Sequence, residues 1–437
     1  MSEIKIVKLE NYSTSSSTSE LGSGPEKDGY DVDRTNGGTA WYAYYSIVCA
    51  TAGTGMLGLP SALKRGGWGG VALIITALIM SIYGGVILQK SMYKGKHRRL
   101  ASYKELATES FGWIGGWVAF FFTFWILVGT PILYLVLAAQ SLNQLCEGTA
   151  GEIGTFAWTI IWCVVVGIPF IFLKTMNNVA WASLFGAIAI SATVLITVIL
   201  SGIDAPNQLH NPHDNVIWEG FPVALATISY GAGTNIIYAN VEGSMKDRRQ
   251  WPKVIIGALG TCMCLYIAVA VCGYEVYGTN VDNPVYNSTP DGPARTVAIV
   301  LVVINVVISS PIYMLPFAVD VENMLNITVE RFGNTKELLI RAAFRTSIMV
   351  FVAAVGILIP FFDLLMSLFG ALANASLVFV LPVLFYWRLT GIRNKHIIEL
   401  AWNCLILLFG GVAFVFGTWA AIEDLIDAFK DGYEYRI

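Results

Sequence analysis

The chain has 437 residues, of which 55% are hydrophobic and 13% charged, and its mean hydropathy is +0.63. Soluble domains carry about 25% charged residues. Because apolar runs recur along the whole length, this composition excludes a soluble protein with one anchor and predicts an all-α polytopic membrane protein in a lipid bilayer. The formal net charge is −3, and the sequence has no cluster of basic residues of the kind that binds nucleic acid.

The chain divides into a polar tail, a membrane domain and a short carboxyl-terminal tail. Residues 1–38 carry a Ser/Thr run and predict a disordered cytosolic tail. The membrane domain is expected at 39–430, followed by a tail at 431–437. Eleven spanning segments are expected in the domain, at 41–63, 68–92, 115–140, 155–173, 179–201, 220–241, 254–276, 295–319, 343–361, 364–386 and 398–421.

Lysine and arginine gather in alternate loops, which sets the expected orientation. By the positive-inside rule, the amino terminus is cytosolic and the carboxyl terminus lies on the far side. Asn287 begins an Asn-Ser-Thr sequon in a far-side loop and is a glycosylation candidate, whereas Asn326 of Asn-Ile-Thr should stay bare. The seven cysteines predict neither a disulfide nor a metal site.

The first segment has an unusual middle. Thr51-Ala-Gly-Thr-Gly55 stands where leucines would be expected, and Pro60 follows five residues later. Glycine costs about 1 kcal/mol in a helix interior relative to alanine, and lipid cannot satisfy an unwound backbone. One interpretation is a helix interrupted at mid-membrane depth, as in secondary transporters. The other is a patch of small residues for close helix packing.

The sixth segment repeats this anomaly. Gly231 and Gly233 interrupt its apolar span, and Ala232-Gly-Thr234 echoes Ala52-Gly-Thr54. The two segments start five segments apart, and because five is odd, a second five-helix unit must insert with opposite orientation. This predicts alternating access by an inverted five-plus-five repeat with broken helices 1 and 6. Repeat one is expected at 41–201, repeat two at 220–386 and an extra helix at 398–421.

The middle of every expected segment lacks Lys, Arg, Asp, Glu and His. Recognition must then come from backbone groups and hydroxyls at the two breaks. Because no buried charge would balance a charged side chain, a small zwitterion is the best chemical match. The expected substrate-binding residues are Thr51, Ala52, Gly53, Thr54, Gly55, Met56, Ser229, Tyr230, Gly231 and Thr234, with Tyr134 and Asn374 as weaker candidates.

Three hypotheses about coupling and function follow. In a proton-coupled carrier, Glu242 is the group expected to titrate, although an ion pair with Lys246 or Arg248 is an equal alternative for it. A sodium-coupled carrier would use Ser309, Ser310 and first-helix carbonyls as oxygen ligands. A substrate-sensing receptor without flux is the third possibility. No hydrolase, metalloprotease or phosphate-loop motif is present, so neither an enzyme nor a cofactor is expected.

Several motifs resemble one transporter family. Gly53-Thr-Gly-Met-Leu-Gly-Leu-Pro60, followed by Gly66-Gly-Trp-Gly69, resembles the first-helix signature of the amino acid/auxin permease family. Ser229-Tyr-Gly231 with Val241-Glu-Gly-Ser-Met-Lys246 is similar to its sixth-helix motif, and 370–382 to its tenth helix. The resemblance implies an amino acid transporter of LeuT-like fold with eleven helices. It also implies coupling to protons, or in some branches to sodium, and substrate contacts at both breaks.

The carboxyl-terminal part is most similar to the branch of vesicular inhibitory and plant vacuolar amino acid transporters, on the evidence of Gly417-Thr-Trp and Ala428-Phe-Lys430. This implies residence in a vesicular, vacuolar, lysosomal or plasma membrane. The chain departs from the family pattern twice. Residues 202–219 lack the second cysteine of the family's loop disulfide, and no proline immediately precedes Glu242.

Overall fold

The computed structural model describes residues 37–94, 99–173, 180–208, 210–327, 329–393 and 395–430. The tails expected at 1–38 and 431–437 lie outside these ranges, except for residues 37 and 38. The helices are α1 (Ala40–Thr51), α2 (Thr54–Leu57), α3 (Leu59–Gly66), α4 (Gly69–Met92), α5 (Tyr103–Leu145), α6 (Thr155–Phe172), α7 (Ala180–Asp204), α8 (Phe221–Gly231), α9 (Asn235–Gly243), α10 (Trp251–Tyr277), α11 (Pro293–Met324), α12 (Val329–Phe332), α13 (Asn334–Leu358), α14 (Phe362–Phe369), α15 (Leu381–Thr390), α16 (Ile397–Val412) and α17 (Thr418–Lys430).

Nine helical stretches in the described ranges are long and apolar enough to cross a membrane. The expected first and sixth segments are not among them, because each is divided into shorter helices. The expected tenth segment is one continuous stretch in which a π-helix, Gly370–Val380, joins α14 to α15. The prediction of an all-helical membrane protein is therefore confirmed.

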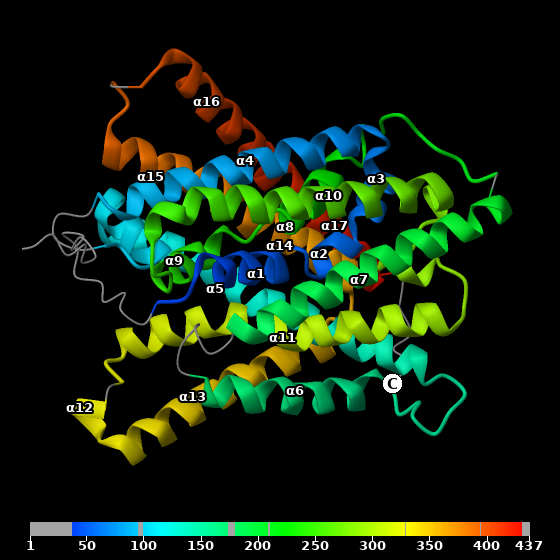
Figure 1. Ribbon diagram of the computed structural model, residues 1–437, viewed down its shortest axis with the longest axis horizontal. Coiled ribbons are helices and arrows are strands. Elements are labelled where there is room, and N and C mark those ends of the chain that lie inside the picture. The colour runs from blue at the N-terminus through cyan, green and yellow to red at the C-terminus, as the bar shows by residue number, and fades with distance from the viewer. Residues whose placement is uncertain are drawn as a thin grey trace, which may run out of the picture.

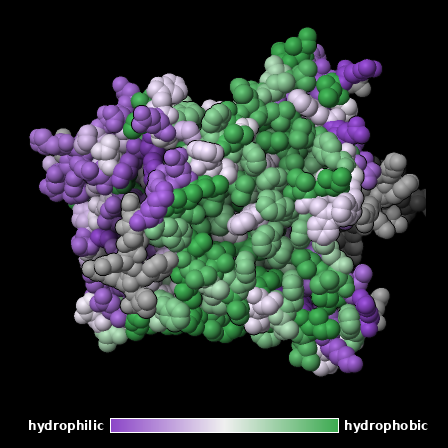
Figure 2. All heavy atoms as spheres, turned by 180° about the vertical axis from the view of Figure 1, so that it is seen from behind, coloured by the Kyte–Doolittle hydropathy of each residue, from purple (hydrophilic) through white to green (hydrophobic). Residues whose placement is uncertain are grey.

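The divided helices lie at the centre of the bundle. Figure 1 shows α1, α2, α8 and α9 in the middle, with α4 and α10 on one side and α6, α11 and α13 on the other. The surrounding helices are long because their sequences are continuous apolar runs, and they carry most of the exposed apolar side chains. Figure 2 shows these side chains as a broad hydrophobic band with hydrophilic residues at the ends. Such a band suits a lipid-facing surface.

The first long helix after α4 shows how local sequence sets the fold. Ser102 caps α5, since its hydroxyl accepts a bond from Glu105 N (3.3 Å), and the Glu105 carboxylate accepts one from Ala101 N (2.8 Å). This pair resembles a capping box, except that the second bond comes from the amide of the residue before the N-cap. Gly112, at φ 73°, then bends the chain inside α5. A short helical segment, 103–111, thus precedes the long apolar part of α5.

The beginning of α1 and the end of α9 meet at one end of the bundle, here called the amino-terminal face. Gly38 N donates to Ser244 O (2.8 Å), and Lys246 N donates to Gly38 O (2.9 Å). The segment before the first divided helix is therefore fastened to the segment after the second.

Candidate functional site

Both divided helices break where the sequence places its glycines. Helix α1 ends at Thr51, and Gly53 takes an extended conformation (φ −66°, ψ −150°) before α2 begins at Thr54. Helix α8 ends at Gly231, and three residues pass before α9 begins at Asn235. Each helix end leaves its last carbonyls without partners in its own helix.

Side chains from other elements satisfy the carbonyls at the end of α1. Each of the last three residues of the helix has its carbonyl bonded from α10 or α11. The donors are Ser309 Oγ to Cys49 O (3.3 Å), Tyr313 Oη to Ala50 O (3.2 Å) and Tyr266 Oη to Thr51 O (2.5 Å). The break is therefore held by neutral hydrogen bonds.

The end of α8 is treated in the same way, with donors from α4, α10 and the π-helix. The bonds run from Asn374 Nδ2 to Tyr230 O (3.3 Å), Tyr266 Oη to Gly231 O (2.6 Å) and Ser81 Oγ to Ala232 O (3.0 Å). Tyr266 Oη lies within hydrogen-bonding distance of one carbonyl at each break, and its single O–H donates to one of them at a time. Asn374 lies so close to Gly233 that a Cβ there would stand 2.0 Å from its Nδ2.

The two breaks contact each other directly. Thr51 Oγ1 and Thr234 Oγ1 are 2.7 Å apart, a hydroxyl pair that links α1 to the start of α9. A Cβ on Gly55 would come within 3.0 Å of Gly231 Cα and 3.1 Å of the Tyr230 ring. Glycine at position 55 therefore permits close approach of the two backbones.

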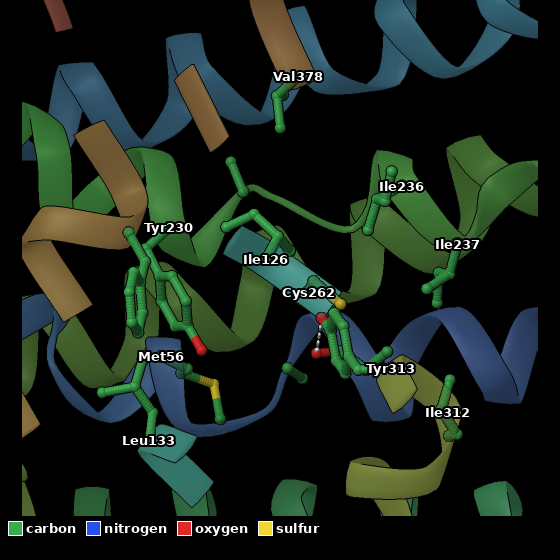
Figure 3. Close-up of a cluster of buried hydrophobic side chains, with 14 of the residues drawn as sticks. Met56, Ile126, Leu133, Tyr230, Ile236, Ile237, Cys262, Ile312, Tyr313 and Val378 are labelled. Carbon is green, nitrogen blue, oxygen red and sulfur yellow. Dashed lines mark hydrogen bonds between the residues drawn. The ribbon is translucent and has the colours of Figure 1, made fainter. Parts of the chain in front are cut away.

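A small enclosed cavity lies where the breaks meet. Its free volume is about 10 Å³, which is about what one water molecule requires. It is lined by Ala50, Thr51, Gly55, Thr130, Tyr134, Tyr230, Gly231, Gly233, Thr234, Tyr313 and Asn374. None of these side chains is charged at neutral pH. In Figure 3 the hydroxyls of Tyr230 and Tyr313 both point toward the space between the two rings.

The structure brings most of the predicted substrate-binding residues to this cavity. Those that line it are Thr51, Gly55, Tyr134, Tyr230, Gly231 and Thr234, and the weaker candidate Asn374 joins them.

The other predicted residues lie nearby without lining the cavity. Gly53 adjoins Tyr134, whose Oη would be 2.8 Å from a Cβ at that position. Ala52 and Met56 are fully buried in the core. Ser229 turns back to its own helix, where its hydroxyl donates to Leu225 O (2.6 Å).

Three side-chain oxygens beside the cavity have unused hydrogen-bonding capacity. Within the described part of the chain, Thr54 Oγ1, Tyr230 Oη and Asn374 Oδ1 are buried without a hydrogen bond of normal geometry. Leaving a buried polar group unsatisfied costs about 1–3 kcal/mol. A polar ligand in an enlarged cavity would remove that cost.

Thr130 and Tyr313 line the cavity but are missing from the predicted set. Both had a signal in the sequence, because each stands near a proline inside a long apolar segment. Thr130 precedes Pro131, and Tyr313 lies between Pro311 and Pro316. Proline inside a helix removes a hydrogen bond and opens the local backbone.

The candidate coupling group Glu242 is fully buried near the amino-terminal face, at the end of α9. Its carboxylate receives bonds from Arg99 Nε (2.8 Å) and Tyr93 Oη (2.6 Å), and Arg99 Nη2 lies 2.7 Å from Oε2. The sequence suggested Lys246 or Arg248 as the ion-pair partner; the structure places Arg99 there, from the loop before α5.

The two candidate sodium ligands have protein partners in this conformation. Ser309 Oγ bonds to Cys49 O, as described above, and Ser310 Oγ donates to Val306 O (2.8 Å) in its own helix. Both hydroxyls are buried beside the first break.

The sequon residue Asn287 ends a short 3₁₀ helix, Val285–Asn287, and is half-buried. The hydroxyl of Thr289, the sequon threonine, donates to Tyr286 O (2.7 Å). Glycosylation of Asn287 remains a prediction.

Comparison with known proteins agrees with this architecture. The chain is 24% identical to Amino acid transporter AVT1B of Arabidopsis thaliana over 406 residues, covering 91% of this chain and 73% of the relative. It is 27% identical to the Vesicular inhibitory amino acid transporter of Macaca fascicularis, covering 96% and 82%. The predicted resemblance is thereby confirmed. These relatives are named as transporters, so the expectation that the chain is not an enzyme is confirmed as well.

Solved structures show the same fold. A Na⁺-coupled sialic acid symporter in a substrate-bound outward-open state matches with a TM-score of 0.59 at 12% identity, covering 89% of this chain and 91% of the other. The inward-facing conformation of Mhp1 matches with a TM-score of 0.53 at 14% identity, covering 94% and 96%. Both share the LeuT-like architecture. The profile of the transmembrane amino acid transporter protein family matches residues 36–423, and the chain belongs to that family.

Proposed function

We propose that this protein is a secondary active transporter of small zwitterionic amino acids. The observation that carries the proposal is the meeting of two divided helices around an enclosed polar cavity. No side chain that lines it is charged, and unused hydrogen-bonding oxygens adjoin it. The names of the relatives, which are amino acid transporters, support the substrate class.

Eleven membrane crossings and an inverted five-plus-five repeat are part of the same proposal. Nine helical stretches are long enough to cross on their own. The first crossing would be made by α1 to α3 and the sixth by α8 and α9, since each set forms a divided helix of adequate length. Each divided helix is then the first helix of its repeat, as in inverted-repeat transporters.

The cavity as described holds about one water molecule, so substrate entry requires the surrounding helices to separate. This is the behaviour of a closed state between outward-open and inward-open states, and it supports alternating access. The substrate amino group is expected at the unsatisfied oxygens of Tyr230 and Asn374. The carboxylate is expected at backbone amides that follow Gly53.

A proton is the proposed coupling ion, with sodium as the alternative. The hydroxyls of Ser309 and Ser310 already donate to main-chain carbonyls, so a sodium ion between them would have to replace those bonds. Glu242, the coupling group expected from the sequence, is paired with Arg99, so its carboxylate becomes accessible only when that pair separates. One relative is named as a vesicular transporter, which favours an internal membrane.

Uptake into proteoliposomes tests the proposal. A panel of radiolabelled amino acids is offered while the pH and sodium gradients are varied independently. We expect uptake of small neutral amino acids to follow the pH gradient. Uptake that needs sodium and ignores pH contradicts proton coupling, whereas binding without flux favours a substrate-sensing receptor.

Glycine variants test the role of the breaks. Gly55→Val should abolish uptake without preventing membrane insertion, because its side chain would collide with Gly231 and Tyr230. The matched control is Gly260→Val, at a position in α10 where a Cβ meets nothing within 4 Å. Full uptake by Gly55→Val would show that the glycines serve only helix packing.

A further inference from the structure

One tyrosine joins the two breaks through a single oxygen atom. Tyr266 lies in α10 and is almost completely buried. Its Oη is 2.5 Å from Thr51 O and 2.6 Å from Gly231 O, the carbonyls of the final residues of α1 and α8. These residues are 180 positions apart in the chain, so the contact is a junction between the two halves of the fold.

The junction has two carbonyl acceptors but only one hydroxyl proton to donate to them. A phenol carries one O–H donor, so at any moment it donates to one carbonyl, and the other carbonyl faces the lone pairs of the same oxygen. Both carbonyls also lie at the negative ends of their helices, each equivalent to roughly half an elementary charge. Positive charge is therefore favoured at the position of this oxygen.

The two oxygen–oxygen distances are those of short hydrogen bonds, and they also fall in the range at which oxygen ligands hold a cation. Hard cations such as Ca²⁺ are held by oxygen ligands at about 2.3–2.6 Å. In discontinuous transporter helices, such carbonyls and half-helix carboxyl-terminal ends coordinate the coupling cation. Here the tyrosine hydroxyl occupies that position as a fixed, uncharged group.

We propose that Tyr266 is a specificity-determining residue whose hydroxyl takes the place of a monovalent alkali cation between the two breaks and so excludes sodium from this junction. The inference rests on the proposed transport function and deepens it. The hydroxyl supplies the donor that joins the two breaks without an ion, and sodium coupling at this junction becomes unnecessary. Removing the hydroxyl deprives both carbonyls of this partner, and a sodium ion would then take its place between them.

The test is Tyr266→Phe, compared with wild type and with Tyr313→Phe. Tyr313 is the matched control, because its hydroxyl lies at the same break but donates to one carbonyl only, Ala50 O at 3.2 Å. The purified proteins are melted in sodium chloride and in N-methyl-D-glucamine chloride at equal ionic strength. A ligand that binds only the folded state raises the melting temperature by mass action.

We expect sodium to raise the melting temperature of Tyr266→Phe by several degrees and to leave wild type and Tyr313→Phe unchanged. Equal melting temperatures of Tyr266→Phe in the two salts overturn the proposal, and so does a wild type that sodium stabilises as strongly as it stabilises the variant. If Tyr266→Phe cannot be purified without sodium, recovery in sodium alone supports the proposal, and equal loss in both salts overturns it.

The melting experiment needs no transport, so it separates this inference from the proposed function. Sodium-dependent melting of Tyr266→Phe in a protein that takes up no amino acid would support the junction and contradict the transporter. If wild type takes up amino acids and sodium does not change the melting temperature of Tyr266→Phe, the transporter is supported and the junction proposal is overturned.

Discussion

The ion pair between Arg99 and Glu242 offers a quantitative test of how the amino-terminal face is held together. The Arg99 side chain is 6% exposed and that of Glu242 is 0% exposed. Two nitrogens of the guanidinium contact the same carboxylate oxygen at 2.8 and 2.7 Å, and Arg99 Nη2 also donates to Ala239 O. The change considered is Arg99→Met, which removes the charge and retains an apolar stem.

The expected loss follows from burial. Removing one partner of a buried ion pair costs about 3–5 kcal/mol, because the remaining charge is left in a medium of low dielectric constant. Replacing both partners by apolar residues avoids the uncompensated charge. We therefore expect Arg99→Met to lower the free energy of unfolding by about 3–5 kcal/mol and the double variant with Glu242→Leu to lose less than that.

The assay is denaturant unfolding in detergent micelles, with free energies from linear extrapolation. Lys430→Ala is the matched control, since its pair with Asp427 is largely exposed and such surface pairs contribute about 0–1 kcal/mol. Arg99→Lys keeps the charge but loses the planar fork, and should fall between wild type and Arg99→Met. The reasoning is refuted if Arg99→Met loses no more than Lys430→Ala, or if the double variant loses as much as the single one.

Three further predictions concern other sites. Asn374→Ala should raise the KM for amino acid uptake by about tenfold or more, because a hydrogen bond to a charged group contributes roughly 1.5–3 kcal/mol; concentration-dependent uptake measures it, and an unchanged KM would place the substrate elsewhere. Arg345→Ala should lower the free energy of unfolding by about 3–5 kcal/mol, since Arg345 Nε pairs with Glu322 (2.7 Å) in a buried setting; denaturant unfolding measures the loss, and a loss below 1 kcal/mol would contradict it. A glycan should be lost in Asn287→Gln and not in Asn326→Gln, as read from gel mobility, and the opposite pattern would reverse the orientation.

The positions of the two breaks could be predicted because their cause is local. Glycines at Gly53 and Gly231 weaken a helix by a known amount, and the structure ends α1 and α8 within two residues of them. The start of α5 is equally local, since the side chains of Ser102 and Glu105 accept bonds from the amides of Glu105 and Ala101. Structural features that depend only on residues close together in the chain can therefore be predicted from a single sequence.

The partners of the broken ends could not be predicted in the same way. Tyr266 and Thr51 are 215 residues apart, and nothing in an apolar segment distinguishes a tyrosine that serves a carbonyl from one at a membrane interface. Glu242 illustrates the same difficulty. Nearby basic residues in the chain suggested its partner, but Arg99, 143 positions away, is brought to it by the packing of the loop before α5.

The distribution of strong and weak contacts bears on the proposed mechanism. The contacts between the two breaks are neutral hydrogen bonds, such as Thr51 to Thr234, and each contributes about 0.5–1.5 kcal/mol. The buried ion pair of Glu242 with Arg99 lies at the amino-terminal face, and a charge left buried there without its partner costs about 3–5 kcal/mol. Opening toward that face would separate this buried pair, whereas opening toward the opposite face would separate neutral bonds and the partly exposed pair of Arg65 with Asp424 (2.9 Å), which contributes about 0–1 kcal/mol. With the amino-terminal face on the cytosolic side, as the positive-inside rule predicts, the outward-open state is expected to be reached more readily than the inward-open state in the absence of substrate.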